Sequence, residues 1–117
     1  MMKISIVIPF HNEEKNLIEL IPKLVKNLKL IKEVNFELIF VDDKSSDSSF
    51  QICKKRIKNH KNIVFKSIKL KKKGGQTGAF KTAFKIAKGK YIIRMDSDLQ
   101  DNPKDILKFI KKIKKGY

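Results

Sequence analysis

Short apolar runs alternate with helical patterns along this chain, and that alternation limits its fold more than any other feature. Strands are expected at 4–10, 36–43, 62–68 and 90–95, and apolar residues recur at helical spacing after each. The first run, ISIVIPF, is apolar except for Ser5 and rich in β-branched residues, as in strands that are buried on both faces. The pattern predicts an α/β fold with an open, mainly parallel sheet of about four strands and helices on both faces.

Helix signals fill the segments between these runs. We expect Asn12 to cap the first helix, and Pro22 to kink or restart it. Gly89 is expected to end the third helix as its C′ residue, and Asn102 with Pro103 to open the fourth. The four predicted apolar faces are Leu17, Ile21, Leu24 and Leu28; Phe50, Cys53 and Ile57; Ala79, Phe80, Ala83, Phe84 and Ala87; and Ile106, Phe109, Ile110 and Ile113.

The length of 117 residues is that of one domain, and the hydrophobic fraction of 41% is enough for a folded core. The single cysteine, Cys53, cannot form an internal disulfide and fits a reducing, cytoplasmic compartment. No stretch approaches the roughly 20 apolar residues that span a bilayer, and the first apolar run is too short for a secretion signal. We expect a soluble or peripheral cytoplasmic chain.

The formal net charge of +16 has two interpretations. Lysines occur on every predicted helix, so the charge fits an ordinary solvated surface. Two dense clusters, Lys66–Lys73 and Lys108–Lys115, also fit a non-catalytic basic module that binds a polyanion or an anionic membrane surface. Neither cluster has the interleaved aromatic side chains of a single-strand nucleic-acid platform, so nucleic acid is not expected as a partner.

Polar and acidic residues gather where the predicted strands end. In open parallel sheets, ligands bind beyond the carboxyl ends of the strands. That rule selects 9–14, 42–47, the loop before Gly78, and 96–101. A parallel sheet brings these distant segments to one end, where we expect the ligand site.

Asp96 and Asp98 follow the fourth strand, and side chains two apart on an extended backbone point to the same side. Their repulsion is relieved by a raised pKa or by a cation, and a hard ion such as Mg²⁺ or Mn²⁺ prefers oxygen ligands. Gln100 offers a further carbonyl oxygen if the chain stays extended. The alternative is that Asp98 or Asp101 serves the N-terminus of the following helix.

The other strand ends offer contacts for a nucleotide. Asp43 could bind a ribose hydroxyl or a base N–H, as strand-end carboxylates do in nucleotide folds, unless it is a solvated turn residue. The glycine-rich run at 74–78 precedes a helix, so its backbone N–H groups could face a phosphate, and Lys71–Lys73 favour an anionic ligand. His11 could be a general base, although a lone histidine at a strand end more often belongs to a loop.

Together these segments resemble the family 2 glycosyltransferases of the GT-A fold, and among them the polyprenyl-phosphate sugar transferases of the dolichyl-phosphate mannose synthase type. The resemblance lies in SIVIPFHNEEKNL, ELIFVDDKSSDSS and KKGGQTGAFKTAFKIAKGKYIIRMDSDLQDNP. These stretches follow the order and spacing of the family. The combination is specific, since MDSDLQDNP after AKGKY is far rarer than either piece.

The resemblance implies a role for each matching position. Asp96, Asp98 and Gln100 would form a D-x-D-x-Q set that binds Mg²⁺ or Mn²⁺. Glu13 would contact the ribose or base, and Asp43 would hold the base. The implied nucleotide-sugar-binding set is Pro9, Asn12, Glu13, Asp43, Lys73, Gly75, Gly78 and Asp96. One departure is KLKKKGG, where the family usually has an Arg-Asn pair before the glycines.

The implied reaction transfers a sugar from a UDP- or GDP-sugar to an acceptor, a polyprenyl phosphate, with inversion, in cell-envelope glycan synthesis. A polyprenyl phosphate is already ionised at neutral pH and would not require a catalytic base. Family members continue well past the D-x-D helix, so a catalytic base is expected either beyond Tyr117 or not at all. Residues 1–117 are expected to form a single nucleotide-sugar-binding domain, the N-terminal part of a truncated catalytic domain that does not turn over alone.

Overall fold

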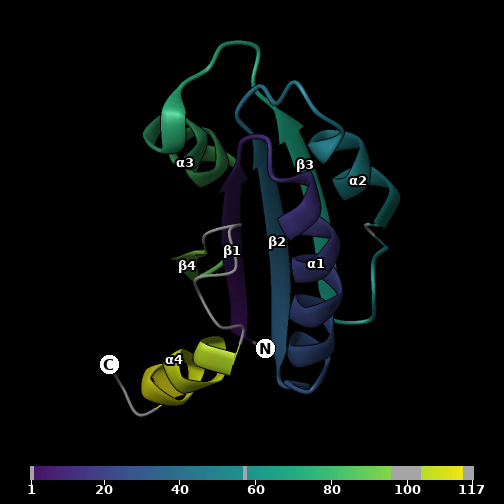
Figure 1. Ribbon diagram of the computed structural model, residues 1–117. Helices are drawn as coiled ribbons and strands as arrows, with labels where there is room; N and C mark the ends of the chain where they lie inside the picture. Colours follow the sequence, from purple (N-terminus) through teal and green to yellow (C-terminus); the bar gives the residue numbers. More distant parts are fainter. Residues whose placement is uncertain (1, 57, 96–103, 115–117) are drawn as a thin grey trace.

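The structure is a computed structural model that describes residues 2–56, 58–95 and 104–114. Within these residues, the centre of the molecule is a sheet of four parallel strands in the order β3-β2-β1-β4 (Figure 1). The parallel sheet predicted from the sequence is therefore confirmed. The strands are β1 (Met2–Phe10), β2 (Val34–Asp42), β3 (Ile63–Lys69) and β4 (Tyr91–Arg94).

The two central strands take the most apolar runs because they are covered on both faces. β1 and β2 are paired along their whole length, from Met2 beside Val34 to Phe10 beside Asp42. Residues 4–10 of β1 are all buried, as expected for a run without polar alternation. The outer strand β3 is more open, and Val64 is exposed there.

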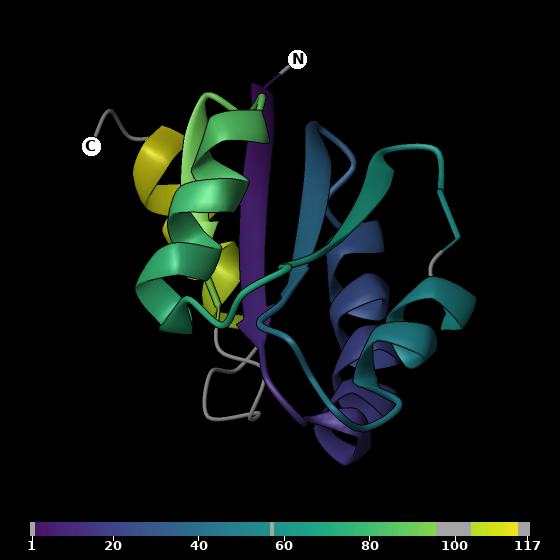
Figure 2. The ribbon, with the colours of Figure 1, turned by 90° about the horizontal axis from the view of Figure 1, so that it is seen from above.

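The strands are followed by the helices α1 (Glu14–Lys29), α2 (Ser49–Arg56), α3 (Gly75–Ile86) and α4 (Lys104–Lys114). Figure 2 shows α3 on one face of the sheet and α1 with α2 on the other. None of the helices in the described part of the chain is both long and apolar enough to cross a membrane. The larger core lies against α1 and includes Ile4, Ile6, Ile8, Leu17 and Leu24, and the smaller core lies against α3 and consists of Val7, Ile39, Val41, Ala79 and Ala83.

The four residues predicted to form the apolar face of α1 are all buried. Of the two outcomes expected at Pro22, a kink or a restart, the restart is wrong, because one helix runs from Glu14 to Lys29 through it. Proline removes the bond to the carbonyl four residues earlier, and that residue, Ile18, is exposed, so water can satisfy its carbonyl. The predicted cap is also corrected, since Glu13 holds the N-cap position and Asn12 lies before it.

Two expectations about α3 differ from the structure. Ala79 and Ala83 are buried against the sheet, but Phe84 is 57% exposed. At 3.6 residues per turn it lies about 140° round the helix from Ala79, away from the sheet-facing side. The helix ends at Ile86, so Gly89 is not its C′ residue. A Cβ atom on Gly89 would lie 2.4 Å from the backbone nitrogen of Ser5, so glycine is needed where the chain passes β1.

A buried carboxylate joins the strands on the α3 face. Glu37 of β2 is 1% exposed and accepts hydrogen bonds from the Ser5 hydroxyl at 2.8 Å and the Lys88 backbone N–H at 2.9 Å. Its Oε2 pairs with Lys66 Nζ on β3 at 2.7 Å. Burial raises the pKa of Glu37, but the hydrogen bonds and the Lys66 charge outweigh burial and leave the pKa below its ordinary value. This carboxylate therefore ties β1, β2, β3 and the link to β4 together.

Candidate functional site

The carboxyl ends of the three longer strands lie together, as the parallel fold requires (Figure 1). The backbone N–H of Asp43 donates to the carbonyl of Phe10 at 2.8 Å. The backbone N–H of Leu70 donates to the carbonyl of Asp42 at 2.9 Å. The loops after β1, β2 and β3 therefore leave the sheet side by side, although they are separated by tens of residues in the sequence.

Asn12 joins the loop after β1 to the loop after β2. Its backbone has a left-handed φ of 53°, a conformation in which asparagine is enriched among non-glycine residues. Its side-chain Oδ1 accepts from the backbone N–H groups of Ser46 at 2.8 Å and Asp47 at 3.3 Å. Its own backbone N–H donates to the Ser45 hydroxyl at 2.9 Å. In this structure Asn12 thus acts as a brace between two loops, a role that its capping signal did not indicate.

The serine-rich segment after β2 completes this brace. The backbone N–H of Glu13 donates to the Ser49 hydroxyl at 2.9 Å. Asp47 Oδ1 accepts from the backbone N–H of Ser49, the first residue of α2, also at 2.9 Å. Burial raises the pKa of Asp47, but the hydrogen bonds from Ser49 outweigh it, so the pKa of this carboxyl lies below its ordinary value. The two loops are therefore held by charge-assisted and neutral hydrogen bonds before any ligand arrives.

Asp43 lies at the junction of all three loops. It is 5% exposed, and its Oδ1 accepts from the backbone N–H of Gly74 at 2.8 Å. Its carbonyl oxygen lies 2.8 Å from Nδ1 of His11, so the imidazole is held in the loop after β1. The carboxylate predicted to hold a base therefore also fixes the start of the glycine loop.

Asp42, the neighbouring acid, is fully buried. Its Oδ1 accepts from the backbone N–H of Ser45 at 2.7 Å, while Oδ2 is buried without a hydrogen-bond partner among the described residues. Burial, with a smaller contribution from the Asp42 charge, raises the pKa of the Cys53 thiol to about 12. The predicted place of Cys53 in the core is confirmed, and its raised pKa makes the thiol unreactive.

The glycine-rich run forms the first turn of α3. Gly74 is the N-cap residue, and Gly75 has a left-handed φ of 68°. The backbone N–H of Gly78 donates to the carbonyl of Gly74 at 3.1 Å, which closes the turn. The amides before Gly78 have no acceptor within the helix and sit at its positive end, which suits an anion. Lys73, which is exposed, directly precedes this turn.

Two further predicted binding residues lie at the same end of the sheet. Pro9 is buried in β1 beside Val41 of β2. Glu13 is partly buried, and one of its carboxylate oxygens accepts from the side chain of Asn16 in the first turn of α1. The structure therefore brings Pro9, Asn12, Glu13, Asp43, Lys73, Gly75 and Gly78 to one end of the molecule.

The predicted metal set lies outside the described residues, which stop at Met95 and resume at Lys104. Met95 is buried, and its backbone N–H donates to the carbonyl of Val7 at 2.9 Å, beside β1. In the described part of the chain, no group of three or more His, Cys, Asp or Glu residues could hold a metal ion. The roles of Asp96, Asp98 and Gln100 therefore stay predictions.

The expectation about a catalytic base also falls outside the described residues. Such a base is expected beyond Tyr117 or not at all, and the described residues end at Lys114. The candidate base that the sequence offered within the chain is His11, whose Nδ1 lies against the Asp43 carbonyl. The expectation that any base lies beyond Tyr117, or that none is required, therefore stays a prediction.

Comparison with known proteins agrees with this geometry. Residues 5–117 match the model of glycosyl transferase family 2. The undecaprenyl-phosphate 4-deoxy-4-formamido-L-arabinose transferase of Proteus mirabilis is 36% identical over 115 residues, which are 98% of this chain and 35% of that protein. The chain thus spans about a third of the length of the curated relatives it matches.

Solved structures with the same fold carry nucleotide sugars. S. aureus TarS 1-349 in complex with UDP-GlcNAc is 30% identical with a TM-score of 0.70, over 95% of this chain and 32% of that one. The mannosyltransferase PcManGT of Pyrobaculum calidifontis, in complex with GDP-Man and Mn²⁺, has a TM-score of 0.68 at 19% identity, over 81% of this chain and 27% of that one. The expected GT-A fold is confirmed by these likenesses.

Proposed function

The chain belongs to glycosyl transferase family 2, and we propose that it forms the donor-binding part of a metal-dependent glycosyltransferase. The donor is a UDP- or GDP-sugar, and the acceptor is a polyprenyl phosphate. The observation that carries this proposal is the junction at Asp43, which fixes the glycine loop beside the braced loops after β1 and β2. The names of the relatives add support, since one acts on undecaprenyl phosphate and the solved neighbours hold UDP-GlcNAc and GDP-Man.

Asp43 serves two purposes in this proposal. Its bond to Gly74 positions the glycine loop, and a carboxylate has acceptor capacity beyond one such bond, which can take an N–H of the base. Because Asp43 is buried, a hydrogen bond to it is stronger than one formed in water. Glu13, on the adjoining loop, contacts the ribose or base.

The first turn of α3 receives the diphosphate. Backbone N–H groups at the start of this helix donate to phosphate oxygens, and Gly75 lets the chain adopt the left-handed conformation that this turn needs. Lys73 adds a mobile positive charge directly before the turn. Together they stabilise negative charge as the nucleoside diphosphate departs.

Asp96, Asp98 and Gln100 would hold the metal ion. This set offers oxygen ligands, and the residue before it, Met95, is buried and hydrogen-bonded to Val7 of β1. Oxygen donors fit Mg²⁺ or Mn²⁺ rather than a soft ion. When bound, such an ion supplies Lewis-acid stabilisation of the diphosphate leaving group.

The acceptor attacks the anomeric carbon from the face opposite the diphosphate, so the configuration inverts. An ionised polyprenyl phosphate needs no general base, in keeping with His11 being held at the Asp43 carbonyl. Because the chain spans 35% of its relative, we also propose that it binds the donor but does not turn over alone.

Calorimetric titration with UDP and GDP, each with and without Mn²⁺, tests the donor site. We expect one nucleotide to bind only with Mn²⁺, and Asp98→Asn to lose that binding. Asp101→Asn is the matched control, because it removes the same charge nearby without touching the D-x-D-x-Q set, and it should retain binding. Equal binding by wild type and Asp98→Asn contradicts the proposed metal site. Sugar transfer to undecaprenyl phosphate by this chain alone contradicts the proposal that it does not turn over.

A further inference from the structure

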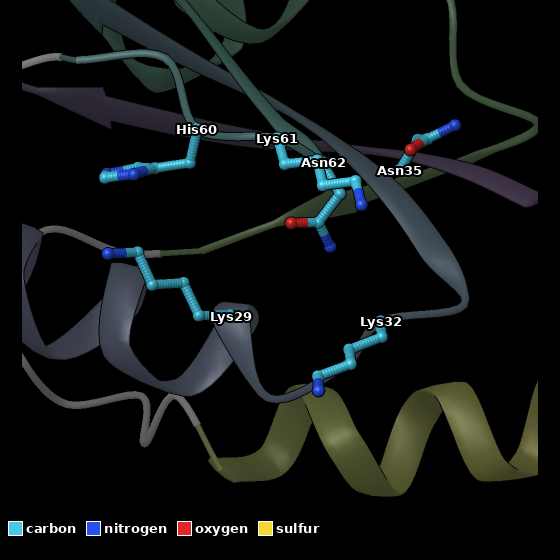
Figure 3. A pocket seen from close by; sticks show the side chains of 6 residues that line it. All are labelled: Lys29, Lys32, Asn35, His60, Lys61 and Asn62. Carbon is cyan, nitrogen blue, oxygen red and sulfur yellow. The ribbon is translucent and has the colours of Figure 1, made fainter.

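A basic pocket lies at the amino end of the sheet, opposite the candidate donor site. It has a volume of about 610 Å³ and forms where α1 ends and where β2 and β3 begin. Figure 3 shows its lining side chains, which come from the end of α1, the turn after it, the start of β2 and the segment before β3. The lining residues are Lys29, Lys32, Asn35, His60, Lys61 and Asn62, and none of those described carries a carboxylate.

A second hollow of about 550 Å³ continues this pocket between α1 and α2, and the two share Lys29 and His60. We call the two together the basic groove. Its floor is partly apolar, with Pro22 and Val25 of α1 among its lining residues. Its lysines fall into two rows at three-residue spacing, Lys26, Lys29 and Lys32 from α1 and the turn after it, and Lys55, Lys58 and Lys61 from α2 and the segment after it.

Hydrogen bonds to backbone groups hold the inner end of the basic groove in shape. The side-chain amide of Asn62 donates to the carbonyls of Ile31 and Val34, both at 3.0 Å, so the turn after α1 is fastened to the start of β3. His60 and Ile63 exchange backbone hydrogen bonds at 2.9 and 3.2 Å. A site whose walls are formed beforehand needs less ordering when a ligand binds.

The described lining of the groove carries positive side chains on both walls and no carboxylate. The helix dipole offsets part of the charge of Lys26 and Lys29 in the last turn of α1, but it does not reach Lys61 on the facing wall. Glu33, in the same turn as Lys32, is not among the lining residues. Like charges on two facing walls raise the local potential and attract a multivalent anion.

We propose that the basic groove binds the phosphate groups of a soluble linear oligophosphate. Two joined hollows are larger than one phosphate group needs, and rows of lysines suit a chain of charges. A flat bilayer would meet the rims of the groove rather than its recessed end at Asn62 and His60. The groove is independent of the donor site, because the two lie at opposite ends of the strands.

Titration of the whole chain with inorganic tripolyphosphate in EDTA tests this site. Lys29→Glu with Lys61→Glu should weaken binding about tenfold or more, since each removes a charge-assisted contact and adds a repulsive one. Lys81→Glu with Lys85→Glu, at exposed positions of α3, changes the net charge equally and should weaken binding less than about threefold.

Equal weakening in the two double variants would mean that net charge alone binds the polyanion, and it would overturn the proposal. So would failure of wild type to bind tripolyphosphate. Phosphatidylglycerol vesicles provide the second arm, and vesicle binding that depends on Lys29 and Lys61 and resists tripolyphosphate would assign the groove to a membrane instead. Lys29→Ala with Lys61→Ala should also lose affinity, and thermal unfolding confirms that each variant is folded. Because EDTA removes divalent metal and the variants lie far from Asp43, failure here leaves the donor site untested.

Discussion

Glu37→Gln should destabilise the fold in a way that depends on pH. Glutamine can keep an oxygen at the Oε1 position, where Ser5 and Lys88 donate. It then places an NH₂ group at the Oε2 position, 2.7 Å from Lys66 Nζ, so two donors face each other. The charge-assisted bond to Lys66 is lost and a repulsive contact replaces it.

The size of this effect follows from the exposure of the two side chains. A hydrogen bond to a charged group contributes about 1.5–3 kcal/mol. The Lys66 side chain is 32% exposed, so it can turn toward solvent after the change, and we expect a loss of about 2 kcal/mol. With an m-value of about 2 kcal/mol/M, the urea midpoint at pH 7 should fall by about 1 M.

The pH dependence supplies the sharper test. The pKa of Glu37 is lowered in the folded state, so its contribution is present above the unfolded pKa and is lost as pH falls through the folded value. The difference in free energy of unfolding between wild type and Glu37→Gln should therefore be constant near neutral pH. It should shrink below pH 4.5, the ordinary pKa of this carboxyl. Urea unfolding followed by circular dichroism measures both. A difference that stays the same at all pH values, or one below about 0.5 kcal/mol at pH 7, would refute this reasoning.

Three further predictions concern positions outside that cluster. Gly89→Ala should lower the free energy of unfolding by more than about 2 kcal/mol, because its Cβ would lie 2.4 Å from the Ser5 backbone. Gly78→Ala has open space around the new methyl, so it should be neutral or stabilising by up to about 1 kcal/mol. Chemical denaturation measures both. Cys53, with a pKa of about 12, should react with a thiol reagent at pH 8 only as fast as the chain unfolds, and fast reaction in native buffer would contradict its burial. Asn12→Gly permits the left-handed backbone but removes the bridging oxygen, so it should cost about 1 kcal/mol and an unchanged urea midpoint would refute the brace.

Strong local patterns explain how much of the fold was predictable. The run at 4–10 is apolar except for Ser5, which is typical of a strand covered on both faces, and the structure places β1 there. Leu17, Leu24 and Leu28 repeat at the helical period and are all buried in α1. The parallel direction of the strands follows from the alternation of strand and helix. The same alternation predicted that the loops near Asp43 and Gly75 lie at one end of the sheet.

Long-range contacts explain what the sequence did not reveal. Asn12 looked like a helix cap, but its side chain bonds to Ser46 and Asp47, more than thirty residues away. Gly89 looked like a helix terminator, but glycine is required there because a Cβ atom would clash with the Ser5 backbone in β1. The basic groove was also missed, because its lysines come from two segments about thirty residues apart and gather only when α1 and α2 lie side by side.

Amide chemical shifts during titration with UDP or GDP and Mg²⁺ test the donor site most directly. If the loops at the carboxyl end of the sheet bind the nucleotide, the amides of Asn12, Gly74 and Gly75 should shift with saturation and only with Mg²⁺, whereas any shift of Asn62 in the basic groove should not require Mg²⁺. The same titration without Mg²⁺ should move the resonances of Asn12, Gly74 and Gly75 little. Saturable shifts at Asn62 with none at Gly74 and Gly75 would contradict the placement of the donor at this end of the sheet.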